Sequence, residues 1–80
     1  MDRIQAMQMF MRVAEAGSFV SAAETLTLPA STVTSTIKNL EKYLKVRLLN
    51  RNTRRVSLTP EGMQYLAQCR EILALIEHSV

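Results

Sequence analysis

Hydrophobic residues in the opening segment of the chain recur at the spacing of an α-helix. Steps of three, four and three positions connect one stripe, which consists of Ile4, Met7, Met11 and Ala14. Phe10 and Val13 widen this stripe, and Gly17 stands where a helix can end in the left-handed conformation. The pattern predicts a first helix that buries its methionine-rich side in the core.

A second, shorter helix is predicted directly after this glycine. Ser18 is a good N-cap residue, and the segment from Phe19 to about Leu26 follows it. The inward side of this helix would hold Phe19, Ala22, Ala23 and Leu26. The two alanines are small enough to let a neighbouring helix cross closely.

Segment 29–44, PASTVTSTIKNLEKYL, combines a surface rich in hydroxyl groups with a helical core stripe. Its first half is mostly Pro, Ser and Thr, which are weak helix formers in an interior position. Its hydrophobic residues nevertheless keep steps of four, three and four: Val33, Ile37, Leu40 and Leu44. Pro29 suits the first turn of such a helix. Together with the preceding helix, this segment predicts a helix–turn–helix.

Residues 45–58 have the pattern of a small β-hairpin. Hydrophobic positions flank a polar tip at Asn52 and Thr53, and Val56 and Leu58 alternate with polar neighbours. One face of this hairpin can therefore pack on the domain while the other face carries charge.

The last part of the chain begins with a helix-start signal. Thr59 is a cap residue, Pro60 fits the first helical position, and Glu61 places an acid in the first turn. An apolar stripe then keeps steps of three, four, three and four: Leu66, Cys69, Leu73, Ile76 and Val80. We expect this stripe to be the interface of a homodimer. The alternative is that the helix folds back on its own domain.

Charge is unevenly distributed along the 80 residues, whose net charge is +3. Between Thr25 and Pro60, seven basic residues stand against the single acid Glu41, so this part has a charge of +6 and the remainder −3. A basic middle between acidic flanks is typical of a surface that meets a polyanion. The alternative is a charged surface that only contacts solvent.

A nucleic-acid interface would explain the hydroxyl-rich face of segment 29–44. A helix that enters the major groove needs short donors and acceptors near the base edges. The candidate residues on this helix are Ala30, Ser31, Thr32, Thr34, Ser35 and Lys38. Ser18, at the start of the preceding helix, could help to hold a phosphate. Arg51, Arg54 and Arg55 surround the hairpin tip and suit the DNA backbone or minor groove.

The residue types needed for catalysis or metal binding are sparse. His78 is the only histidine, Cys69 is the only cysteine, and Gly17 and Gly62 are too few for a phosphate-binding loop. We therefore expect no enzyme activity, no cofactor and no metal site. No internal disulfide is possible and no apolar run approaches membrane-spanning length, which favours a soluble, cytoplasmic protein.

The sequence resembles the N-terminal domain of LysR-type transcriptional regulators across essentially its whole length. The matching residues are Gly17, Ser18, Phe19, Ala22, Ala23, Leu26, Val33, Ile37, Leu40, Glu41, Leu44, Leu48, Arg51, Leu58, Thr59 and Gly62. The resemblance implies a mainly α fold: a winged helix–turn–helix with a three-helix core and a two-stranded β-wing in 1–58, and a long linker helix in 59–80. It also implies a bacterial, nucleoid-associated homodimer. Helix 29–44 would enter the major groove of double-stranded operator DNA, and wing 51–55 would lie on its backbone or minor groove.

Three positions depart from the pattern of this family. Ala30 and Ser35 stand where members often carry long polar or basic side chains, so base contacts should depend more on the hydroxyl groups and Lys38. Lys45 replaces the usual glycine, which disfavours a tight left-handed turn there. Members of the family normally continue into an effector-binding domain, so we expect this sequence to be a fragment of a longer regulator. A winged helix that docks on an acidic protein is the alternative function.

Overall fold

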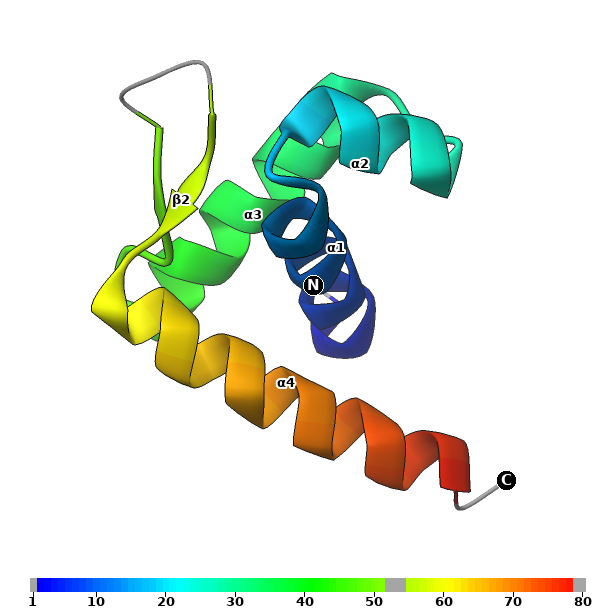
Figure 1. Cartoon of the computed structure of the whole chain (residues 1–80), viewed down its shortest axis with the longest axis vertical. Coiled ribbons are helices and arrows are strands. Elements are labelled where there is room, and N and C mark those ends of the chain that lie inside the picture. Colours follow the sequence, from blue (N-terminus) through cyan, green and yellow to red (C-terminus); the bar gives the residue numbers. More distant parts are fainter. Residues whose placement is uncertain (1, 52–54, 79–80) are drawn as a thin grey trace.

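The computed structural model describes residues 2–51 and 55–78 and contains four helices and one pair of strands in that part of the chain (Figure 1). The elements are α1 (Arg3–Ala16), α2 (Phe19–Leu26), α3 (Ala30–Leu44), β1 (Leu49–Asn50), β2 (Ser57–Leu58) and α4 (Pro60–His78). Helices α1, α2 and α3 pack against one another, and α4 runs along the lower side of the molecule in Figure 1, against α1. The predicted hairpin tip at Asn52 and Thr53 lies outside the described residues.

The two strands form an antiparallel pair that connects α3 to α4. Leu49 is opposite Leu58, and Asn50 is opposite Ser57. Leu49 is fully buried, Val56 and Leu58 are half-buried, and Ser57 is exposed. One face of the hairpin therefore packs on the domain, as the alternating pattern predicted.

The predicted ends of α1 and α2 are confirmed by their backbone geometry. Gly17 ends α1 in the left-handed conformation with φ of +70°. Ser18 caps α2, because its Oγ accepts a hydrogen bond from the amide of Ser21 at 3.3 Å.

Two expectations about the ends of α3 are wrong. Pro29 is not in the first turn but precedes it as the N-cap, because its ψ of 142° is extended. Lys45 does adopt the left-handed conformation, with φ of +61°, and its amide donates to the carbonyl of Glu41. A residue with a Cβ therefore makes this turn, at a modest conformational cost.

The core lies where α1, α2, α3, the hairpin and α4 meet. The predicted stripe of α3 is confirmed, since Val33, Ile37 and Leu40 are fully buried. The stripe of α1 is only partly correct: Met7 is buried, but Ile4 is 45% exposed. Helix α1 contacts α2, α3 and α4, so more than one of its faces is buried. Its other buried residues are Ala6, Met9, Phe10 and Val13.

Three of the five residues in the apolar stripe of α4 face their own domain, which corrects their predicted place at a dimer interface. Leu66, Cys69 and Leu73 belong to the same core cluster as the buried residues of α1. Ile76 is 37% exposed at the edge of this packing, and Val80 lies outside the described residues. The physical reason is that so small a domain needs the most regular stripe of its longest helix to cover its core.

The start of α4 is fixed closely against the hairpin. The Thr59 hydroxyl donates to the carbonyl of Arg47 at 2.6 Å and accepts from the amide of Gly62 at 2.9 Å. A Cβ on Gly62 would lie 2.0 Å from the carbonyl oxygen of Leu48, so only glycine permits this approach. Within residues 2–51 and 55–78, no helix is long and apolar enough to cross a membrane.

Candidate nucleic-acid interface

One face of α3 presents short polar side chains and two lysines to solvent. Ser31, Ser35, Lys38 and Lys42 follow steps of four, three and four, and all four are exposed. The opposite face contains the buried Val33, Ile37 and Leu40, so packing fixes which side of the helix is available. The structure therefore displays the hydroxyl-rich face that the sequence predicted.

The other candidates on α3 occupy different positions around the helix. Thr34 is half-buried beside Lys38, at the edge that faces the hairpin. Ala30 is half-buried and packs on the core cluster. Thr32 is exposed, and the helical period places it about 100° around the helix from Ser31. The structure thus brings Thr34 together with the exposed face, whereas Ala30 and Thr32 lie at its margins.

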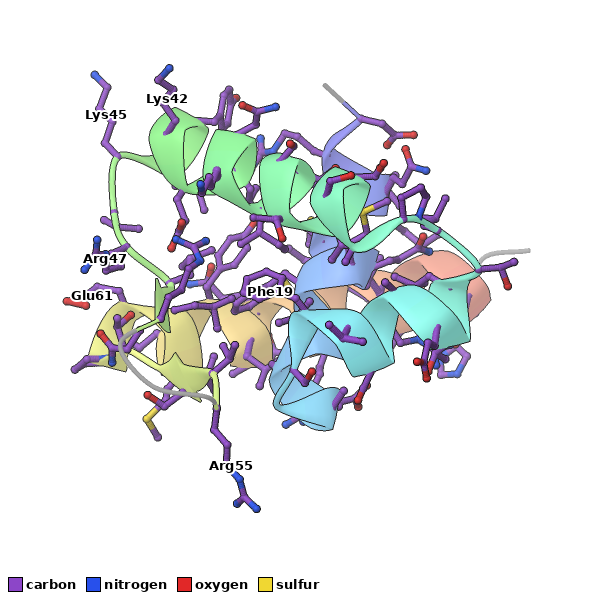
Figure 2. All side chains as sticks on the ribbon, turned by 90° about the horizontal axis from the view of Figure 1, so that it is seen from above. Phe19, Lys42, Lys45, Arg47, Arg55 and Glu61 are labelled. Atoms are coloured by element: carbon purple, nitrogen blue, oxygen red, sulfur yellow. The ribbon has the colours of Figure 1, made fainter. Side chains whose placement is uncertain are left out.

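A cleft of about 320 Å³ lies where α3, the start of α2 and the hairpin meet. Its lining residues come from these three elements and are Ser18, Phe19, Val20, Thr34, Lys38, Arg51 and Val56. Figure 2 looks onto this junction, with Phe19 near its middle. A cleft with Lys38 in its wall and hydroxyl groups beside it is suited to an anionic chain.

The start of α2 contributes backbone donors to this cleft. Because Ser18 is the cap, the first amides of α2 have no carbonyl partner within the helix. Such amides and the positive end of the helix dipole favour a phosphate group. Val20 is 60% exposed on the same turn, so an aliphatic surface lies among these polar groups.

Exposed cations border the junction on both sides. Lys42 and Lys45 project from one side of α3, while Arg55 projects from the hairpin on the opposite side of the view (Figure 2). The predicted wing residue Arg54 lies outside the described residues.

Arg51, predicted as a DNA contact, has partners inside the protein. Its Nη2 is 2.8 Å from Oε1 of Glu41, and its guanidinium carbon lies 5.4 Å from the ring centre of Phe19. The side chain of Arg51 is 28% exposed and that of Glu41 is 12% exposed. Arg51 therefore joins the hairpin to α3 and α2.

Cys69, one of the residues considered for catalysis, is buried in the core. Burial raises the pKa of the Cys69 thiol to about 11, which leaves it protonated and unreactive at neutral pH. Within the described part of the chain, no three His, Cys, Asp or Glu side chains are grouped as metal ligands.

Sequence reasoning missed two residues at this junction. Lys42 continues the spacing of Ser31, Ser35 and Lys38 by one further step of four, so the helical period alone could have identified it. The sequence marks Glu41 as the single acid of a basic segment and as a match to the family pattern, but neither signal assigns it a role. Its contact with Arg51 depends on the way the hairpin returns to α3, and no helical or strand period indicates that geometry.

Three packed helices, a paired hairpin and an exposed polar face on the third helix define a winged helix–turn–helix protein. Comparison with known proteins identifies its family: the sequence model described as bacterial regulatory helix-turn-helix protein, lysR family, matches residues 4–63. The chain therefore belongs to the LysR family.

Similar proteins support this assignment. A transcriptional repressor of Pseudomonas aeruginosa is 47% identical over 77 residues, which are 96% of this chain and 24% of that protein. The crystal structure of the BenM DNA-binding domain with benA site 1 DNA has a TM-score of 0.93 at 30% identity, covering 95% of this chain and 88% of that one. The CbnR DNA-binding domain in complex with DNA has a TM-score of 0.92 at 36% identity, covering 95% and 87%. The chain spans about a quarter of the length of the repressor.

Proposed function

We propose that this chain is the sequence-specific DNA-binding part of a bacterial transcriptional regulator. The observation that carries the proposal is the exposed Ser31, Ser35 and Lys38 face of α3 beside the cleft of about 320 Å³. DNA complexes of similar domains, those of BenM and CbnR, support it. Helix α3 would enter the major groove, and the hairpin would lie on the backbone or in the minor groove.

The proposed contacts divide into base readout and positioning. Ser31, Thr34, Ser35 and Lys38 would approach base edges, with Thr32 and Ala30 at the margins of this contact. Ser18 and the first amides of α2 would hold one phosphate. Arg54 and Arg55 would contact phosphates or the minor groove, which adds affinity without much sequence choice.

We also propose that the protein binds DNA as a homodimer through the outer face of α4. The inward stripe is used by the core, but Ile72 is 44% exposed and Leu75 is 71% exposed. Ile76, at 37%, extends this apolar surface toward the end of the helix. A second copy related by a two-fold axis would bury these side chains. Two recognition helices would then meet two half-sites of a roughly palindromic operator.

DNA selection from a fragmented bacterial genome tests the proposal. The purified chain is incubated with the fragment pool, retained DNA is sequenced, and recovered sites are measured by gel shift at about 50 and 200 mM salt. We expect enrichment of related, roughly symmetric sites whose affinity falls steeply with salt. Absence of binding even at the lower salt concentration would contradict DNA binding and favour an acidic protein as the partner.

A further inference from the structure

The carboxylate of Glu41 attaches the hairpin to α3, the helix proposed to enter the major groove. Its Oε2 accepts hydrogen bonds from the amides of Leu48 at 2.8 Å and Leu49 at 3.2 Å. Its Oε1 accepts from Nη2 of Arg51 at 2.8 Å. One side chain of α3 therefore holds three donors from the segment that leads into and through β1.

These donors require an acceptor. Leu48 and Leu49 have 0% exposure, and a buried amide without a partner costs about 1–3 kcal/mol. The short hairpin supplies few backbone bonds, because β1 and β2 contain two residues each. A carboxylate can accept all three bonds at once, whereas an amide side chain would turn a donor toward one of the partners.

The opposite strand is attached elsewhere. The amide of Val56 donates to the carbonyl of Gly17 at 3.1 Å, and the amide of Thr59 donates to the carbonyl of Leu48 at 3.0 Å. Thr59 bonds the carbonyls of both Leu48 and Arg47, so the two strands are joined to each other. The side-chain bonds that connect the segment around β1 to α3 are those of Glu41 with Leu48, Leu49 and Arg51.

We infer that Glu41 and Arg51 are positioning residues for DNA binding, which set the place of the wing relative to the recognition helix. This inference rests on the proposed function. In this role Glu41 contacts no DNA. The guanidinium of Arg51 forms an ion pair with Glu41 and a cation–π contact with the ring of Phe19. Arg51 is thereby reassigned from a phosphate contact to a link between β1, α3 and α2.

The sign of the effect on affinity separates positioning from simple charge. Removing an acid from a surface that binds a polyanion reduces repulsion, so charge alone predicts tighter DNA binding for Glu41→Gln. Loss of the attachment predicts the opposite, because the wing and α3 then no longer meet the DNA in one fixed arrangement. Glu61→Gln is the matched control, since Glu61 is exposed at the start of α4 and its loss changes the charge equally.

The experiment measures DNA affinity and its salt dependence for wild type, Glu41→Gln and Glu61→Gln, using a fragment selected by the wild-type chain. Melting curves first establish a temperature at which each variant is folded. We expect Glu41→Gln to bind at least about tenfold more weakly with an unchanged salt slope, and amide exchange at Leu48 and Leu49 to accelerate. Glu61→Gln should bind as tightly as wild type or slightly more tightly. Unchanged or tighter binding by a folded Glu41→Gln would overturn the inference.

Arg51→Met tests the positioning role independently, and it is the deciding variant if Glu41→Gln does not fold. Glu41 keeps both backbone donors in this variant, so the domain retains its main attachment. Positioning predicts weaker binding with an unchanged salt slope, whereas a lost phosphate contact would make the slope shallower by about 0.9. The shallower slope would overturn the inference. Failure of the wild-type chain to bind any DNA would instead contradict the proposed function.

Discussion

Helices α3 and α4 carry equally regular apolar stripes, but only α3 was expected to use its stripe inside the domain. The structure buries both: Val33, Ile37 and Leu40 of α3, and Leu66, Cys69 and Leu73 of α4. The difference between the helices lies on their outer faces. Helix α3 exposes hydroxyl groups and lysines, whereas α4 exposes Ile72 and Leu75.

In a small domain, a regular apolar stripe on a helix packs into the core of that domain before it is available to a partner. Leu75, which is 71% exposed, lies outside the regular pattern, and Ile76 at the end of that pattern stays 37% exposed. A regular apolar stripe on a terminal helix is therefore weak support for a dimer interface until packing within the chain has been considered.

Burial of both stripes predicts large effects on stability. Ile37→Ala and Leu73→Ala should each lower the free energy of unfolding by about 2–5 kcal/mol, because each leaves a cavity in the shared core. Urea unfolding followed by circular dichroism measures both. A negligible loss for Leu73→Ala would show that α4 does not depend on this packing.

The outer face of α4 should respond differently to substitution. Leu75→Glu places a charge on an exposed surface, so we expect the monomer fold to be kept while the dimer dissociates. Sedimentation should detect a monomer, and affinity for a two-half-site operator should fall by at least about tenfold as binding of the two half-sites is uncoupled. A variant that remains dimeric with wild-type affinity would exclude this face as the interface.

The wing should control affinity more than sequence choice. Arg55→Ala is expected to weaken binding to selected and unrelated DNA alike, and to make the salt slope shallower by about 0.9 if one phosphate contact is lost. Gel shifts at several salt concentrations measure this. Loss of specific binding with intact nonspecific binding would instead assign Arg55 to base readout.

Much of this architecture follows from the sequence, and the exceptions have physical reasons. Hydrophobic spacing predicts the helices, and local chemistry predicts the end of α1 at Gly17 and the start of α2 at Ser18, because these signals act within a few residues. The role of Arg51 could not be predicted, because its partners Glu41 and Phe19 come from separate elements. Lys45 adopts a left-handed turn that its side chain disfavours, which shows that tertiary packing can override local preference.

Burial of Cys69 should give stability a dependence on pH that is confined to alkaline solution. Its folded pKa is about 11, against an ordinary value of 9.0, so the unfolded chain releases this proton first. The contribution is therefore constant below about pH 9 and is lost progressively as pH rises toward 11. Urea unfolding of wild type and Cys69→Ser between pH 7 and about 10 should show a steeper decline in wild type than in the variant. An identical decline in both proteins would assign it to other groups.

The exposed face of α3 should affect specificity with the smallest cost in stability. Ser35→Ala removes one hydroxyl from an exposed position, so the free energy of unfolding should change by less than about 0.5 kcal/mol. Parallel DNA selection with wild type and Ser35→Ala is the most direct test that this face reads bases. We predict that the two proteins retain sites differing at one or two positions in each half-site, with the remaining positions unchanged. Identical site preferences, together with identical affinities, would contradict the assignment of this face of α3 to base readout.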